Sequence, residues 1–179
     1  MTPDQSCLTH YGVKGMRWGV RHDRENDNKK ESYSVKTKSG ETLTLERYKT
    51  PLLTKGLSKI SPKIRQEINN TRHYAVKNSQ GKTVGDYQLY RKSPDEMNIT
   101  WGSIDKKHQG KGYMSAVMKQ GEKIAKKYGA RKITAEVVGN SPDMLSITDK
   151  QGYVRLGKIK TREAVEMWGG LTIVEKQLR

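Results

Sequence analysis

A glycine-rich turn between two regular elements is the part of this sequence best suited to binding a ligand. Residues 103–129 read SIDKKHQGKGYMSAVMKQGEKIAKKYG, in which a strand pattern ends at Ile104 and a helical pattern begins after Gly112. The free N–H groups and the dipole at a helix N-terminus attract anions, and glycines let the backbone approach them closely. Three lysines add positive charge: Lys106, Lys107 and Lys111. The stretch therefore predicts a phosphate site, although such a turn can also be a plain connection between a strand and a helix.

The spacing of apolar residues predicts the elements that hold this turn. Alternation predicts strands in 32–38, 41–48, 72–78, 83–92, 96–104, 132–138, 153–157 and 171–178. Helical spacing, caps and early prolines predict helices in 61–70, 112–129 and 140–151. Strands grouped around a strand–helix–strand–helix–strand segment indicate an α/β protein with a mixed sheet and helices on its faces.

With the turn and the element order in place, the chain resembles the GNAT-type N-acyltransferases. In that family an Arg/Gln-x-x-Gly-x-Gly/Ala loop follows a strand, and Gln109 and Gly112 match its first two fixed positions, while Met114 replaces the third small residue. A second family segment ends in Lys-x-Gly-Phe/Tyr, which Lys150 and residues 152–153 match. The resemblance runs from Ser34 to Arg179 and implies a mixed, mostly antiparallel central sheet flanked by helices, with an N-terminal extension.

The resemblance also implies a cofactor site for acetyl-CoA or another acyl-CoA, without a metal. The strand ending at Ile104 is expected to part from the strand at 133–138, so that the pantetheine arm lies in the opening and pairs with the backbone of Ile104. The helix N-terminus is expected to hold the pyrophosphate through backbone amides. The implied cofactor-binding residues are Ser103, Ile104, Gln109, Gly110, Lys111, Gly112, Tyr113, Met114 and Asn140.

Two proton-transfer roles follow from the same resemblance. Many family members place an acidic Tyr four residues before the last Gly, and Thr148 occupies that position here, with a hydroxyl too weakly acidic to replace a phenol well. Glu96 is the candidate general base, and Asp86 and Glu136 are alternatives. The sequence thus leaves open whether the domain transfers an acyl group to an amine or only binds the cofactor. Trp101 is assigned to packing on the sheet rather than to substrate contact.

Charge and cysteine content restrict the partners. The chain has 35 Lys and Arg against 19 Asp and Glu, a formal net charge of +16, which is compatible with nucleic acid binding as well as with a solvated basic surface. A single cysteine, Cys7, excludes an internal disulfide. No apolar stretch is long enough to span a membrane, and the N-terminus lacks the apolar segment of a Sec signal peptide.

The first 32 residues differ in kind from the rest, so we expect an N-terminal motif and polar linker in 1–32 and the acyltransferase-like domain in 33–179. The stretch YGVKGMRWGVRH, residues 11–22, resembles a motif near the termini of structural and head-associated proteins of tailed bacteriophages. This resemblance implies a phage-encoded protein, in the virion or the host cytoplasm, that contacts a virion or capsid protein through residues 10–22. The expected anchors are Tyr11, Met16, Arg17 and Trp18.

Overall fold

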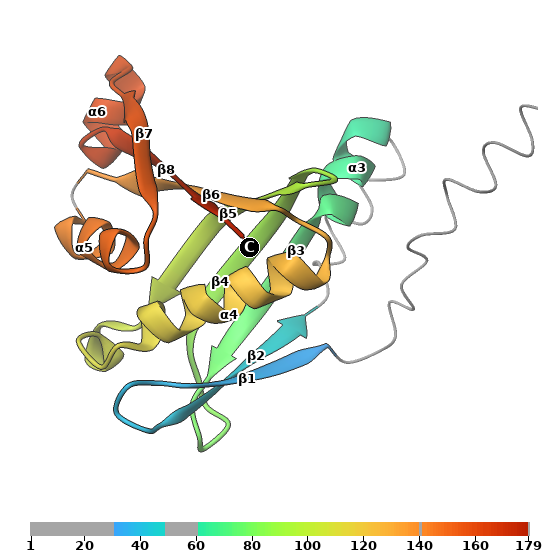
Figure 1. Ribbon diagram of the computed structural model, residues 1–179, viewed down its shortest axis with the longest axis vertical. Coiled ribbons are helices and arrows are strands. Elements are labelled where there is room, and N and C mark those ends of the chain that lie inside the picture. The colour runs from blue at the N-terminus through green and yellow to red at the C-terminus, as the bar shows by residue number, and fades with distance from the viewer. Residues whose placement is uncertain (1–30, 49–60, 140, 179) are drawn as a thin grey trace, which may run out of the picture. The chain divides into compact units, whose positions relative to one another are not determined.

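The described part of the chain, residues 31–48, 61–139 and 141–178 of a computed structural model, contains one eight-stranded sheet (Figure 1). Its order is β1-β2-β3-β4-β5-β6-β8-β7, and every neighbouring pair is antiparallel except β5 and β6. The strands are β1 (Ser32–Lys36), β2 (Thr42–Tyr48), β3 (Thr71–Lys77), β4 (Thr83–Ser93), β5 (Glu96–Ile104), β6 (Lys132–Val138), β7 (Val154–Ile159) and β8 (Leu171–Gln177). The expected mixed, mostly antiparallel sheet flanked by helices is confirmed.

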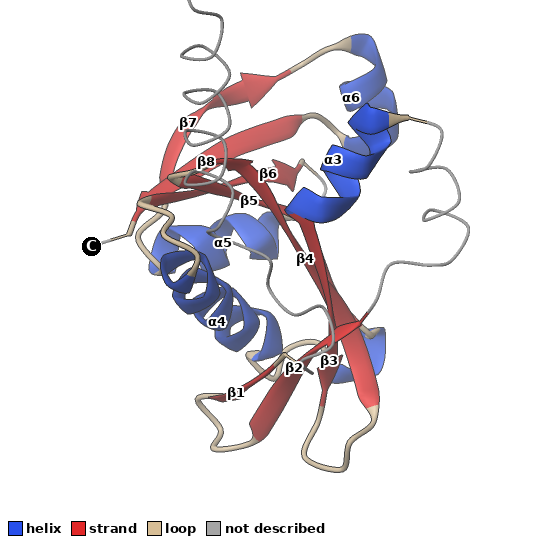
Figure 2. Cartoon of the chain, turned by 90° about the vertical axis from the view of Figure 1, so that its right-hand side faces the viewer, coloured by secondary structure: helices blue, strands red, loops and turns tan. Residues whose placement is uncertain are grey.

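Four α-helices of the described residues flank this sheet: α3 (Pro62–Asn70), α4 (Tyr113–Lys127), α5 (Pro142–Lys150) and α6 (Arg162–Trp168). In Figure 2, α4 and α5 lie on one side of the sheet and α3 and α6 on the other. Helix α3 begins as the sequence predicts, with Pro62 in its first turn and the Ser61 hydroxyl accepting from the Ile64 amide. Helix α6 was not predicted.

The core lies between α4 and the strands beneath it. The apolar face of α4 includes Val117, Met118 and Ile124, all buried against the sheet. Fully burying one large apolar side chain contributes about 1.5–3 kcal/mol, so this cluster fixes α4 on the sheet. The largest fully buried side chains are Tyr74, Tyr87, Leu43, Leu45, Leu89, Met97, Met118, Ile124, Ile133, Val76, Val84 and Val117.

The two parallel strands β5 and β6 pair over only part of their length. Their register runs from Glu96 with Lys132 to Ile99 with Ala135 and then stops, although both strands continue. At the same level the pairing of β5 with β4 shifts, so that Gln88 faces Trp101 while Leu89 faces Ile99. Thr100 is thus the extra residue of a β-bulge, which bends β5. The parting of the strands expected from the sequence is present.

Candidate functional site

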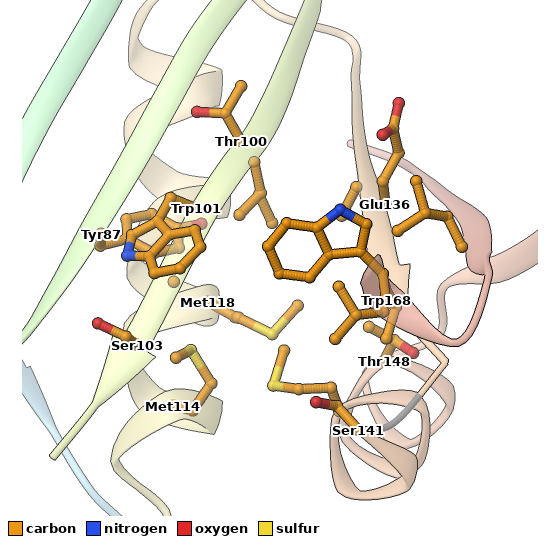
Figure 3. Close-up of a pocket in the computed structure, with 17 residues that line it drawn as sticks. Tyr87, Thr100, Trp101, Ser103, Met114, Met118, Glu136, Ser141, Thr148 and Trp168 are labelled. Atoms are coloured by element: carbon orange, nitrogen blue, oxygen red, sulfur yellow. The ribbon is translucent and has the colours of Figure 1, made fainter. Parts of the chain in front are cut away.

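A cavity of about 450 Å³ occupies the place where β5 and β6 part (Figure 3). Its walls come from β4, β5, β6, the first turns of α4, helix α5, the end of α6 and the start of β8. The lining is mostly apolar, with hydroxyl groups and a single charged side chain among the described residues, that of Glu136. The lining residues are Tyr87, Ile99, Thr100, Trp101, Gly102, Ser103, Met114, Met118, Ala135, Glu136, Val137, Val138, Ser141, Met144, Thr148, Trp168 and Leu171.

The N-terminus of α4 forms one end of the site. Gly112 is the N-cap residue and has φ +75°, a left-handed conformation in which L-residues with a side chain are strained. The first amide of the helix that bonds back is that of Ala116, to the Gly112 carbonyl at 3.1 Å. The three preceding helical amides have no acceptor within the helix, and Gly112 has no side chain to cap them. This end of α4 therefore carries the donors that an anion requires.

Side chains of the turn hold it against the sheet. Gln109 Nε2 donates to the Ile104 carbonyl at 2.9 Å, which fixes the turn to the end of β5. The His108 ring stacks on Tyr113 with centroids 5.9 Å apart, and the Tyr113 hydroxyl donates to Glu41 in the connection between β1 and β2. This hydrogen bond raises the pKa of Tyr113 to about 12, so the phenol stays protonated at neutral pH. These contacts together fix the position of the turn.

Strand register separates the cavity into two sides. Ile99 pairs with Leu89 and with Ala135, and all three side chains point toward the α4 face of the sheet, where Leu89 is buried in the core. Side chains alternate along a strand, so Glu136 points to the opposite face. Trp101 pairs with Gln88, the neighbour of Leu89, and also points to that opposite face. The two side chains thus stand on the face away from α4, where Figure 3 shows the Glu136 carboxylate at the Thr100 end of the cavity.

Trp168, the last residue of α6, completes this second side. Its carbonyl accepts from the Gly139 amide at 2.9 Å, and a Cβ on Gly139 would lie 2.1 Å from the Gly169 carbonyl oxygen. The end of α6 is therefore packed backbone to backbone on the end of β6. In Figure 3 the rings of Trp101 and Trp168 extend from opposite walls into the space between the strands. Their exposed fractions are 49% and 39%, so both indoles are accessible.

The structure brings several sequence-predicted cofactor residues together. Ser103 and Met114 line the cavity, and Ile104 and Gln109 are hydrogen-bonded beside it. Gly110, Lys111, Gly112 and Tyr113 form the turn and the first residue of α4. Asn140 and the four N-terminal anchor residues, Tyr11, Met16, Arg17 and Trp18, lie outside the described residues.

Glu96 lies at the other end of β5 and is not among the described residues that line the cavity. Its carboxylate is 3.1 Å from Lys132 Nζ and 3.2 Å from Lys92 Nζ, and it accepts from the Thr134 hydroxyl at 3.2 Å. Burial raises the pKa of Glu96, but the hydrogen bonds and charges of the two lysines outweigh burial and hold this pKa below its ordinary value. A carboxylate in this environment is a weakened base.

Thr148 does line the cavity, and its side chain is fully buried. Its hydroxyl proton is donated to the Leu145 carbonyl at 2.8 Å, one turn earlier in α5. To protonate a leaving group, Thr148 would have to give up this bond.

Two tryptophans line the cavity, although the sequence alone did not place them there. Trp101 was assigned to sheet packing, but the bulge at Thr100 and the parting of β6 leave its ring at the cavity. Trp168 was missed because α6 was missed. The signals for this helix are present in TREAVEMWGG: Thr161 caps it by accepting from the Ala164 amide at 3.2 Å, and Gly169 follows it with φ +67°.

Over the described ranges, no group of three or more His, Cys, Asp or Glu side chains is placed to hold a metal ion. No helix in the same ranges has both the length and the apolar character that crossing a membrane requires.

The fold agrees with similarities to known proteins. A GNAT family acetyltransferase from Elizabethkingia anophelis, solved with acetyl-CoA bound, matches with a TM-score of 0.61 at 18% identity, covering 76% of this chain and 98% of that one. An IAA acetyltransferase from Bacillus cereus matches with a TM-score of 0.57 at 20% identity, covering 76% and 99%. The spermidine/spermine N-acetyltransferase SpeG from Vibrio cholerae, in complex with manganese ions, matches with a TM-score of 0.59 at 14% identity, covering 76% and 92%.

Two family models match separate parts of the chain. No curated protein matches it. Residues 3–25 match a family of unknown function, DUF7211, and this range contains the N-terminal motif. Residues 42–153 match the model of the acetyltransferase (GNAT) family. Since this second match covers more than half of the sequence, the chain belongs to the acetyltransferase (GNAT) family.

Proposed function

We propose that the protein transfers an acyl group from acetyl-CoA, or another acyl-CoA, to the nitrogen of an amine. The observation that carries this proposal is the cavity where β5 and β6 part, next to the amide donors at the N-terminus of α4. An apolar slot beside an anion site suits a cofactor that has a slender arm and a pyrophosphate. The solved relative with bound acetyl-CoA supports the same donor.

The residues present fit such a cofactor. The amides of Tyr113, Met114 and Ser115 would hold the pyrophosphate, with Lys106, Lys107 and Lys111 supplying positive charge. The side chains of Ser103, Met114, Val138 and Met144 would line the arm. The unpaired edge of β5 after Ile99 offers backbone groups to the amides of the arm, in the manner of an added strand.

When bound, the acyl-CoA supplies a thioester, whose acyl carbon forms a C–N bond to the amine as its C–S bond breaks, giving an amide and a thiol. The chain must bind the amine, take up the proton that the alkylammonium releases, and keep the two reactants together. Among the described residues that line the cavity, Glu136 carries the one carboxylate, so we assign the base role to it in preference to Glu96. Asp86 pairs across the strands with Ser103 and remains the alternative.

Isothermal titration with acetyl-CoA, together with a thiol-release assay over a panel of primary amines, tests this function. Binding in the micromolar range with thiol release that depends on an amine is the expected result. Binding without release to any amine would instead support a second function, cofactor binding without catalysis. The absence of an acidic Tyr at Thr148 favours this second function. Absence of binding at millimolar acetyl-CoA would refute both.

For the N-terminal segment we propose a docking role in a phage particle. The support is the resemblance of residues 10–22 to the bacteriophage motif and a separate family match over 3–25, outside the acetyltransferase match. Deleting residues 1–22 should leave acetyl-CoA binding intact while removing co-sedimentation with virion proteins. Loss of soluble folding on this deletion would contradict a separable tag. Duplex DNA binding that weakens steeply with salt would indicate nucleic acid as the partner instead.

A further inference from the structure

The side of the cavity away from α4 has a composition that can select an amine. It combines two accessible indoles, Trp101 and Trp168, with the Glu136 carboxylate and the Thr100 hydroxyl (Figure 3). These four side chains come from three separate elements, β5, β6 and α6, and the parting of β5 from β6 brings them to one mouth. None of them belongs to the turn that would hold the pyrophosphate.

The chemistry of this mouth matches an ammonium group on an apolar body. An ammonium is attracted to the face of an indole and more strongly to a carboxylate, while an aliphatic or aromatic body gains free energy by packing between indole rings. The Glu136 carboxylate would repel an anion, and a neutral donor would gain a hydrogen bond from it but no charge pairing. The mouth therefore favours a cation over a carboxylic acid or a phosphorylated amine.

The charge count limits the cation to a single positive charge. Glu136 is the sole charged residue among the described residues that line the cavity, so the second and third charges of a polyamine would have no partner there. The chain as a whole carries a formal net charge of +16, and its long-range field repels a polycation more than a monocation.

We propose, resting on the acyl-transfer function above, that the acceptor is a small primary monoamine with an apolar, preferably aromatic, body. Trp101 and Trp168 hold that body and Glu136 pairs with its ammonium group. The substrate class thus differs from the polyamines named for the SpeG relative, although the two proteins share a fold.

The experiment uses two probe amines, 2-phenylethylamine and spermidine, with the full chain carrying Trp18→Phe so that fluorescence reports only Trp101 and Trp168. In the absence of acetyl-CoA, titration with 2-phenylethylamine should change the tryptophan emission at concentrations where titration with spermidine does not. In the transfer assay, kcat/KM should favour 2-phenylethylamine by about 100-fold, because its ring packs between the indoles while the extra charges of spermidine have no partner there.

Variants then locate the preference. Trp101→Ala and Trp168→Ala should each reduce the preference by about tenfold, mainly through KM for the monoamine, with acetyl-CoA affinity unchanged. Glu136→Gln should weaken the fluorescence response to the amine. Met167→Ala, beside Trp168 but with an exposed side chain that does not line the cavity, is the matched control and should change none of these quantities.

The failures are distinguishable. Equal or better use of spermidine by a chain that binds acetyl-CoA would overturn this inference and leave the proposed function intact. If the chain neither binds acetyl-CoA nor transfers an acyl group to any amine, the proposed function is refuted. The fluorescence titration would still decide whether the mouth binds a monoamine. An emission unchanged by 2-phenylethylamine at millimolar concentration would refute the monoamine site.

Discussion

A Cβ atom on Gly121 would lie 2.1 Å from the hydroxyl oxygen of Tyr87. Helix α4 therefore contacts the Tyr87 side chain of β4 at Gly121, the one residue of its buried face without a side chain. Tyr87 is fully buried and lines the cavity. Burial raises the pKa of Tyr87 far above its ordinary value, helped by the nearby Tyr153 and Glu122, so the ring stays neutral. This contact sets how closely α4, and hence its N-terminus, approaches the sheet.

Gly121→Ala is therefore expected to destabilise the protein. Alanine favours the helix by roughly 1 kcal/mol, but overpacking against Tyr87 costs about 1–3 kcal/mol, and the net effect is a lower Tm. Gly157→Ala in β7 is the matched control, because a Cβ there meets nothing within 4 Å. Thermal unfolding of the two variants checks the expectation, and a Tm of Gly121→Ala at or above that of the control would contradict it.

The turn before α4 is tested by Gly112→Glu. Its carboxylate would stand where the pyrophosphate is proposed to bind, and acetyl-CoA affinity should fall by at least about tenfold for one repelling charge. Gly81→Glu has the same strain, since φ is +76° at Gly81 and +75° at Gly112 and a Cβ meets nothing within 4 Å at either. Both variants should lose similar stability, while titration calorimetry should show weakened binding only for Gly112→Glu. Equal acetyl-CoA affinities of the two variants would show that the pyrophosphate does not bind at this turn.

Thr148→Val separates a structural from an acidic role of the hydroxyl. Because the Thr148 proton is donated to the Leu145 carbonyl, the variant should lose about 1 kcal/mol of stability at most. A general acid contributes about 10²-fold or more, so a kcat that changes less than about twofold would exclude that role. A hundredfold fall in kcat, with acetyl-CoA affinity unchanged, would show that Thr148 is the acid.

A half-buried carboxylate, that of Glu31 just before β1, makes stability depend on pH. Tyr128 and Tyr74 donate to Glu31 at 2.7 and 3.4 Å, and Arg47 lies 3.2 Å from it. Burial alone would raise the pKa of Glu31, but hydrogen bonds from Tyr33 and Tyr128 and the charges of Arg47 and Arg72 bring it below its ordinary value of 4.5.

Because the pKa of Glu31 is lower in the folded state than in the unfolded state, its ionised carboxylate stabilises the fold above pH 4.5. This stabilisation is lost as the pH falls through the folded-state pKa. Glu31→Gln should therefore cost on the order of 1 kcal/mol at pH 7, and the difference from the unmodified chain should shrink below pH 4.5. Urea unfolding between pH 3 and 7 measures this, with exposed Glu67→Gln as the control. A difference that does not depend on pH would exclude the titration of Glu31 as its cause.

The sequence was informative where local pattern determines structure. The strand at 96–104 and the strand at 132–138 have the predicted ends, because their apolar alternation and flanking turns are local signals. Position in space was harder to predict: Glu96 and Trp101 lie five residues apart on one strand, yet only Trp101 reaches the cavity, because β6 leaves β5 after Ile99. Helix α6 is seven residues long with an exposed apolar side, so its hydrophobic spacing did not distinguish it from a loop.

The two sides of the cavity are built from different parts of the chain. The side next to α4 depends on main-chain amides and on an unpaired strand edge. Many sequences can supply these groups, so substitutions there would retain the geometry of this side. The opposite side depends on the identity of a few side chains, and backbone contacts at positions 139 and 169 help to place Trp168 there. Under the proposed function, substitutions in α6 and at positions 100, 101 and 136 would exchange one acceptor for another without changing the proposed donor site, which makes this mouth the part of the protein most open to evolutionary change.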